Sequence, residues 1–259
     1  MRLQLFEFGD LSFPPKVYHE FLRSFMGLLY RKLKIHHLWI EPLNNFIKND
    51  NNMLHDPCAG SGEVNLYIKN EMNKAKLEFK FILSDIMTDT VPLFAKTINN
   101  LKDENIYYIE QSVNLLDFQN NENYSKVFIN SFHHFTPSQV SKILEEHFKI
   151  KKDIIVLEYC QRSLMSFLSM IAGPLLSLIL FPFIIKRKHF FSAFVFVYLL
   201  PIIPLMLLWD GIISSLRTYT KKDLQKLMKQ LQISDYKIIE SRKRSLLYPS
   251  GVTAVQIIF

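Results

Sequence analysis

The sequence predicts an α/β fold with a parallel, doubly wound sheet and a hydrophobic helical hairpin inserted late in the chain. Three observations support this prediction. Short apolar strands alternate with amphipathic helices between residues 53 and 157, a rhythm typical of βαβ units. A glycine-containing loop follows the first of these strands, and two long apolar stretches precede the last helix and the last two strands.

The elements follow from residue patterning. Periods of two and bounding turn residues predict strands at 53–55, 79–83, 106–109, 127–130, 154–157, 236–240 and 252–259. Helical periodicity extends over 16–46, with apolar positions such as Phe21 and Phe25 on one face. Further helices are predicted at 63–72, 90–101, 138–148 and 220–231, the last with Thr220 as its N-cap.

Composition narrows the class of protein. A chain of 259 residues can bury one substantial core and a small appendage. The 21% of charged residues excludes an ordinary multi-span membrane protein, and the net charge of +7 suits nucleic acid or an acidic membrane surface. Cys58 and Cys160 form no metal-type pair, which fits a reducing compartment. Residues 1–15 lack the pattern of a secretory signal, so we expect the catalytic part in the cytoplasm.

The loop after the first strand reads Asp56-Pro57-Cys58-Ala59-Gly60-Ser61-Gly62. Its glycines allow a tight turn and let backbone N–H groups approach a ligand, while the start of the next helix favours a carboxylate or phosphate. A dinucleotide fingerprint fails at Asn65, and no Gly-Lys-Ser/Thr follows to make a P-loop. A cofactor loop and a strand-to-helix turn without a ligand both remain open from this segment alone.

Polar residues at the ends of the next three strands favour a nucleoside cofactor. Asp85 ends the second strand, where a carboxylate accepts ribose hydroxyls. Asn114, within residues 111–118, follows the third strand, where an amide meets an adenine amino group. Residues 130–134 follow the fourth strand, beside the reacting atoms. Each of these residues, taken alone, is as consistent with a solvated acid or a strand-end cap. Taken together, they follow successive strands in the order expected of a cofactor site.

Four further motifs carry a family resemblance. They are Phe6-Glu7 with Asp10 and Phe13-Pro14, the segment Phe132-His133-His134-Phe135, the apolar insertion 163–209, and Asp210-Gly211 followed by Ser215-Leu216-Arg217-Thr218-Tyr219. With the glycine loop, they make the chain resemble class I S-adenosylmethionine-dependent methyltransferases over nearly its whole length, and in particular a bacterial group that carries these motifs. The resemblance implies a Rossmann-like seven-stranded sheet with helices on both faces and the last strand inserted antiparallel.

The resemblance also implies residue roles. Asp56, Gly60 and Gly62 would line the methionine end of S-adenosylmethionine, Asp85 the ribose, and Asn114 with Leu115 the adenine. S-adenosylhomocysteine would be the product. The predicted cofactor site is completed by Cys58, Ala59, Ser61, Ile86 and Asn130. Two positions depart from the family pattern, since Cys58 replaces the usual glycine and Asn114 the commoner aspartate.

Catalytic and substrate residues follow from location. Methyl transfer is an in-line displacement in which positioning supplies much of the rate, and a base is needed only for a protonated nucleophile. His133 and His134 are the candidate bases, with packing and strand capping as the alternative. No metal is expected, because no third ligand stands at a recognisable spacing. Predicted substrate contacts are Glu7, Asp10, Glu158, Arg217 and Tyr219; alternatively Glu158 pairs with Arg162, and Arg217 with Asp210.

The insertion favours membrane association. Residues 163–185 and 190–209 carry no charge, and each stretch has the roughly 20 residues needed to cross a bilayer. Sheet strands precede and follow the insertion, so full spanning would put Lys186-Arg187-Lys188 on the far side, against the positive-inside tendency. Prolines at 174, 182, 201 and 204 are expected to interrupt both helices. Broken helices in one leaflet or in the interface fit best; full spanning and a buried hairpin are the alternatives.

The predicted organisation is an N-terminal helical lid at 1–50, a methyltransferase domain at 51–162 and 210–259, and a membrane-associating insertion at 163–209. The predicted function is S-adenosylmethionine-dependent methylation of a small lipophilic acceptor, by a peripheral, monotopic or spanning protein on the cytoplasmic side of a membrane. The alternatives are an RNA or protein methyltransferase and a non-catalytic, cofactor-binding membrane adaptor. Nucleic acid is disfavoured because Asn130-Ser131-Phe132-His133 stands where Asn-Pro-Pro-Tyr/Phe is expected.

Overall fold

The computed structural model describes residues 2–11, 13–48, 52–75, 79–117, 124–185, 189–246 and 248–259. The chain forms two compact units. The sheet unit comprises residues 36–159, 219–243 and 252–259, and the hairpin unit comprises residues 1–35, 160–218 and 244–251. The segment predicted as a lid contributes helix α1 (Lys16–Leu33) to the hairpin unit and helix α2 (His37–Ile47) to the sheet unit.

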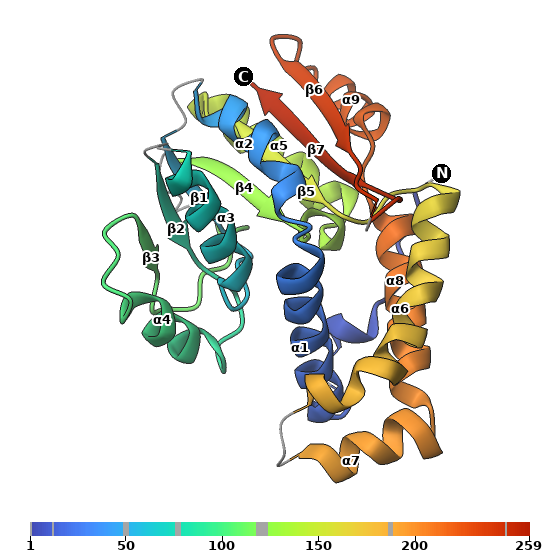
Figure 1. The fold of residues 1–259 in the computed structure, drawn as a ribbon. Coiled ribbons are helices and arrows are strands. Elements are labelled where there is room, and N and C mark those ends of the chain that lie inside the picture. The colour runs from blue at the N-terminus through green and yellow to red at the C-terminus, as the bar shows by residue number, and fades with distance from the viewer. Residues whose placement is uncertain are drawn as a thin grey trace. The chain divides into compact units, whose positions relative to one another are not determined.

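The sheet unit contains seven strands in the order β3-β2-β1-β4-β5-β7-β6 (Figure 1). Their bounds are β1 Met53–Asp56, β2 Lys80–Leu83, β3 Ile106–Tyr108, β4 Ser125–Ile129, β5 Ile154–Glu158, β6 Lys237–Lys243 and β7 Val252–Ile258. Strands β1 to β5 are parallel, and β7 pairs antiparallel with both β5 and β6. The predicted seven-stranded sheet with an inserted antiparallel strand is confirmed.

Helices cover both faces of this sheet (Figure 1). They are α2, α3 (Glu63–Lys74), α4 (Val91–Asn99), α5 (Pro137–Ile150) and α9 (Lys221–Gln230). Both α5 and α9 begin in capping boxes, at Thr136 with Gln139 and at Thr220 with Asp223, so the predicted N-cap at Thr220 is confirmed. Their apolar faces bury a core with Phe128 of β4.

The predicted helical segment 16–46 is two helices. Helix α1 ends where Lys34 adopts a left-handed conformation with φ +50°, and α2 begins at His37. Lys34 donates its backbone N–H to the carbonyl oxygen of Tyr30, which closes the last turn. Periodicity alone did not reveal this break, because both helices keep an apolar face.

The hairpin unit contains α1, α6 (Leu164–Ile184), α7 (Phe190–Phe194), the π-helical turn η5 (Val195–Leu199) and α8 (Ile202–Arg217). Helix α6 packs against α8, and α7 crosses their far ends (Figure 1). The second apolar stretch is broken as predicted: the segments 190–199 and 202–217 meet at 74°, with Pro201 between them. Within the described ranges, α6 is the one helix long and apolar enough to cross a membrane by itself.

The expected interruption of the first apolar helix is wrong. Helix α6 continues through Pro174 and Pro182 over its whole length. A proline in a helix has no backbone N–H, so the carbonyl oxygen four residues before it loses its helical donor. For Pro182 this is the carbonyl oxygen of Leu178, and the Tyr198 hydroxyl donates to it at 2.5 Å. The basic turn Lys186-Arg187-Lys188, on which the membrane prediction also drew, lies outside the described residues.

Candidate cofactor site

Two glycines shape the loop between β1 and α3. Both adopt left-handed backbone conformations, with φ +53° at Gly60 and +70° at Gly62. A Cβ at Gly62 would lie 2.9 Å from Leu83 Cδ1 and 3.2 Å from Ile98 Cδ1. A Cβ at Gly60 would meet no atom of the described residues within 4 Å. Gly62 is therefore required by packing, whereas Gly60 borders open space that a ligand can fill.

Asp56 lies beneath the loop and is only 1% exposed. Its Oδ1 accepts the backbone N–H of Cys58 at 3.1 Å, and its Oδ2 accepts the side-chain amide of Asn65 at 2.9 Å. Burial, with a smaller contribution from the nearby Asp85, raises the pKa of Asp56 to about 7, although the two hydrogen bonds lower it. Asp56 thus titrates near neutral pH although it is buried beneath the loop.

Asp85, at the carboxyl end of β2, binds the loop to the next strand. Its Oδ2 accepts the N–H of Gly60 at 2.9 Å, and its Oδ1 accepts the N–H of Met87 at 3.0 Å. Tyr108, at the end of β3, donates its hydroxyl to the carbonyl oxygen of Gly60 at 2.7 Å. Burial raises the pKa of Tyr108, which keeps this hydroxyl a donor. Three adjacent parallel strands therefore hold one loop.

Sequence reasoning missed Asn65 and Tyr108. Asn65 stands one turn into α3, and its amide reaches back to Asp56. Tyr108 ends a three-residue strand whose position next to β2 appears only in the assembled sheet. The signal that could have identified Tyr108 is its place at the end of the predicted strand 106–109, because the carboxyl ends of parallel strands meet at one edge of a sheet. The sequence instead pointed to Asn114, which lies later in the chain.

The Cys58 position accommodates its departure from glycine. Cys58 is not among the residues with a positive φ, so a side chain there causes no backbone strain. Burial raises the pKa of its thiol well above the usual range, and the nearby Asp56 and Asp85 raise it too. The thiol therefore stays protonated.

The other predicted cofactor residues lie at the same edge. Ser84 accepts the N–H of Ala59 through its carbonyl oxygen at 3.0 Å, and the Ser61 hydroxyl accepts the N–H of Glu63 at 3.4 Å. Ile86 is 59% exposed. The N–H of Val113 donates to the carbonyl oxygen of Asp85 at 2.9 Å, which brings the segment after β3 to the end of β2.

The predicted adenine and strand-four residues have distinct settings. Asn114 is exposed and accepts the N–H of Leu116 at 3.1 Å, whereas Leu115 is buried in the core beneath α5. Asn130 has φ +52°, and its Oδ1 accepts the N–H of Tyr159 at 2.8 Å, so it links the ends of β4 and β5.

His133 and Glu158 form a buried pair at the ends of β4 and β5. The ring Nδ1 of His133 lies 2.9 Å from Glu158 Oε2, and the backbone N–H of His133 donates to Oε1 at 3.2 Å. The two side chains are 2% and 3% exposed. The ring of His134 lies beside that of His133, with centroids 4.2 Å apart. Glu158, predicted as a substrate contact, thus orients a predicted base.

Tyr219 belongs to the same region of the sheet unit. Its hydroxyl donates to the carbonyl oxygen of Phe135 at 2.9 Å, and its ring packs edge-on against Phe132 at 5.6 Å. These contacts fix the Phe-His-His-Phe segment against the start of α9. The predicted role of Tyr219 in holding substrate stays a prediction.

In the hairpin unit, Arg217 and Asp210 each hold the N-terminal segment. Arg217 Nη1 lies 3.0 Å from Glu7 Oε1 and 2.7 Å from Asp10 Oδ2. Asp210 accepts the N–H groups of Phe8 and Gly9, at 2.6 and 2.8 Å, and the hydroxyl of Tyr18 at 2.6 Å. The alternative of an Asp210–Arg217 pair is replaced by these two separate sets of contacts.

One grouping of metal-type ligands was not visible in the spacing. Ligand atoms of His36, His37 and Glu71 lie within 4.8 Å of one another where α2 meets α3. His37 Nε2 and Glu71 Oε1 are 3.6 Å apart, and the His36 ring stacks on Tyr67. These contacts account for the grouping without an ion, and the expectation that the protein needs no metal stays a prediction.

Comparison with solved structures identifies the fold. Magnesium protoporphyrin IX methyltransferase (ChlM) from Synechocystis PCC 6803, with bound S-adenosylhomocysteine, superposes with a TM-score of 0.53 at 10% identity, covering 94% of each chain. The plantazolicin methyltransferase BpumL, in complex with a monoazolic desmethylPZN analog and S-adenosylhomocysteine, gives 0.51 at 11% identity, covering 94% of this chain and 97% of that one. At these identities the likeness shows the class I methyltransferase fold.

A family model described as D12 class N6 adenine-specific DNA methyltransferase matches residues 39–170, just over half of the chain. The chain therefore belongs to the D12 methyltransferase family. Its enzyme class, S-adenosylmethionine-dependent methyltransferase, and its cofactor are confirmed as predicted. A comparison with curated proteins finds no match.

Proposed function

We propose that this protein transfers a methyl group from S-adenosylmethionine to a small lipophilic acceptor at a membrane surface. The observation that carries this proposal is the exposure of α6. It has 21 residues and no charged side chain, and only 17% of its most apolar 18-residue stretch is buried. A core helix of a soluble protein would be mostly buried. The chain enters α6 shortly after β5, whose carboxyl end belongs to the sheet edge where the cofactor loop lies.

The loop residues fit the cofactor. S-adenosylmethionine supplies an electrophilic methyl group on a sulfonium cation. The Asp85 carboxylate binds the N–H of Gly60, which borders open space, and the Asp56 carboxylate lies beneath the same loop, so both attract this positive charge. Each carboxylate oxygen has more than one acceptor position, so Asp85 can bind backbone N–H groups and ribose hydroxyls together. The pKa of Asp56 near 7 lets a bound cation favour its ionised form.

His133 is proposed as the general base for an acceptor that carries a proton. With its Nδ1–H donated to Glu158, the neutral ring bears its lone pair on Nε2. Nε2 would take the proton that the acceptor oxygen or nitrogen loses as it bonds to the methyl carbon and S-adenosylhomocysteine leaves, and the Glu158 carboxylate would stabilise the resulting imidazolium. The two bonds from Glu158, to the ring and to the backbone of His133, fix the orientation of the base.

A second candidate acceptor is adenine in DNA. The printed description of the family names that substrate, and the net charge of +7 suits a nucleic acid. Against it, residues 130–133 read Asn-Ser-Phe-His, and the Asn130 side chain is bonded to the Tyr159 backbone. An exposed apolar helix also serves no purpose in binding a polyanion. We therefore place the lipophilic acceptor first.

The experiment measures label transfer from methyl-labelled S-adenosylmethionine. The full-length protein is incubated with vesicles containing phenolic or carboxylic lipophilic acceptors and, separately, with adenine-containing DNA. Label extracted into the organic phase, and lost in His133→Ala, supports the proposal. Label confined to DNA, or to water-soluble acceptors, overturns it. Isothermal titration with S-adenosylmethionine and a nicotinamide nucleotide first verifies that only the former binds.

A further inference from the structure

We infer that the hairpin unit lies along the plane of one bilayer leaflet, with the exposed side of α6 in the acyl region and α1 toward water. This inference rests on the membrane location in the proposed function and adds the depth and direction of the contact. It also decides between the monotopic and spanning alternatives.

The exposed side of α6 is a single apolar stripe. Leu168 is 50% exposed, Leu175 60%, Ile179 70% and Phe183 79%. Their spacing of seven, four and four residues places them on one helix face. The stripe contains no charged side chain, and its extent is unusual for a surface that faces water.

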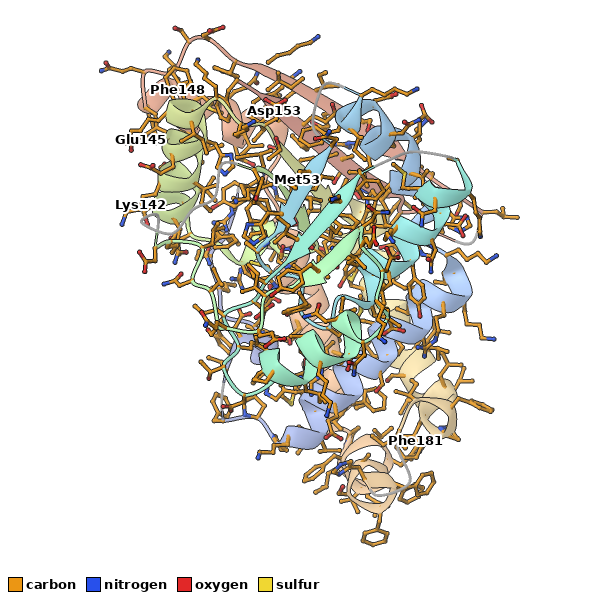
Figure 2. All side chains as sticks on the ribbon, turned by 90° about the vertical axis from the view of Figure 1, so that its left-hand side faces the viewer. Met53, Lys142, Glu145, Phe148, Asp153 and Phe181 are labelled. Atoms are coloured by element: carbon orange, nitrogen blue, oxygen red, sulfur yellow. The ribbon has the colours of Figure 1, made fainter. Side chains whose placement is uncertain are left out.

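Phe181 points to the opposite side of α6 from this stripe, because two residues correspond to about half a turn. Its ring packs against Phe21 of α1 at 6.5 Å and against Phe190 and Tyr198 at 5.1 and 5.4 Å. Figure 2 labels Phe181 at the far end of the hairpin. Helix α1 thus packs against the face of α6 opposite the exposed apolar stripe.

Charged residues of α1 lie beside the far end of the hairpin. Glu20 Oε2 is 3.0 Å from His189 Nε2, next to the start of α7, and Arg23 is exposed one turn further along α1. A hairpin that spanned the bilayer would place Glu20 near the opposite interface and Arg23, one turn further from the far end, in hydrocarbon, where charged side chains are strongly disfavoured. In the plane of a leaflet, the same residues remain at the water side.

Helix α8, on the return from the far end, is too short to span by itself. Helix α8 has 16 residues and a length of about 24 Å, less than the roughly 30 Å of a hydrocarbon core. Its second half begins at Asp210, which is tied to the N-terminal segment. The preceding segment 190–199 runs at 74° to α8 and exposes Phe191 by 80% and Leu199 by 65%. This crosswise segment extends the apolar surface sideways.

The test measures depth along α6. Leu168→Trp, Leu175→Trp and Phe183→Trp are made separately in the full-length protein, and each is bound to anionic vesicles with bromine at shallow or deep acyl positions. The unchanged protein supplies the background from its native tryptophans. In-plane binding predicts equal depths, within a few ångströms, for all three positions. A spanning helix predicts a gradient of about 22 Å from position 168 to 183.

The control is Arg23→Trp on α1, whose fluorescence should not be quenched by either lipid. Graded depths along α6, or deep quenching at position 23, overturn the inference while leaving membrane association intact. Failure of the unchanged protein to float with vesicles overturns the membrane location itself, and with it this inference. The two failures are therefore distinguishable.

Discussion

Replacing each loop glycine by alanine separates a folding role from a binding role. Both residues have left-handed φ angles, +53° at Gly60 and +70° at Gly62, so alanine costs about 1–2 kcal/mol at either position. At Gly62 the added Cβ also lies 2.9 Å from Leu83 and 3.2 Å from Ile98, and such overpacking costs about 1–3 kcal/mol more. The free energy of unfolding should fall by about 1–2 kcal/mol in Gly60→Ala and by about 2–5 kcal/mol in Gly62→Ala.

Cofactor affinity should follow the opposite order. The Cβ at position 60 enters the space that we assign to S-adenosylmethionine, so the dissociation constant should rise about tenfold or more, equivalent to at least ~1.4 kcal/mol. The Cβ at position 62 points toward Leu83 and Ile98, away from that space. Binding to folded Gly62→Ala should therefore change less.

Urea unfolding gives the first comparison and isothermal titration the second, both at one pH and below the unfolding temperature of the weaker variant. Wild-type affinity in Gly60→Ala would show that the space beside Gly60 does not hold the cofactor. Equal destabilisation by both variants would show that Leu83 and Ile98 move aside at little cost, and the packing argument for Gly62 would fail.

Three further predictions concern other contacts. Burial raises the pKa of Asp56 from 3.8 to about 7, so its ionisation destabilises the fold as pH rises from about 4 to 7, by on the order of 4 kcal/mol; Asp56→Asn should flatten the stability–pH curve from urea unfolding, and an unchanged slope would contradict this. Glu158→Gln should lower kcat about 10²-fold or more while leaving affinity for S-adenosylmethionine within about threefold, since it acts on the base His133; a loss confined to KM would argue against that role. Asp210→Ala should cost about 3 kcal/mol of stability, because it removes the acceptor of three donors, and Tyr18→Phe about 1 kcal/mol; similar melting temperatures for the two variants would refute this difference.

Local features of the fold were predictable because their causes lie close together in the chain. The N-cap at Thr220 and the glycine turn after β1 depend on residues within a few positions of one another. The positions of the central strands β4 and β5 follow from apolar runs that are buried on both faces of the parallel sheet. The antiparallel insertion of β7 was predicted only through the family resemblance.

The cofactor loop itself is determined by the sequence, because its glycines, its carboxylates and the order of the strands after it all follow from the residues alone. Only the tertiary structure shows that the two loop glycines differ in role, with Gly62 required by packing and Gly60 bordering open space. Gly60 and Gly62 are the same type of residue, and the sequence does not distinguish them. They differ because Leu83 of β2 and Ile98 of α4 pack against position 62. Likewise, the sequence shows that α1 is amphipathic, but only the contact between Phe21 and Phe181 shows that its apolar face packs against α6. Contacts between residues far apart in the chain depend on how the elements assemble, and no local pattern records that assembly.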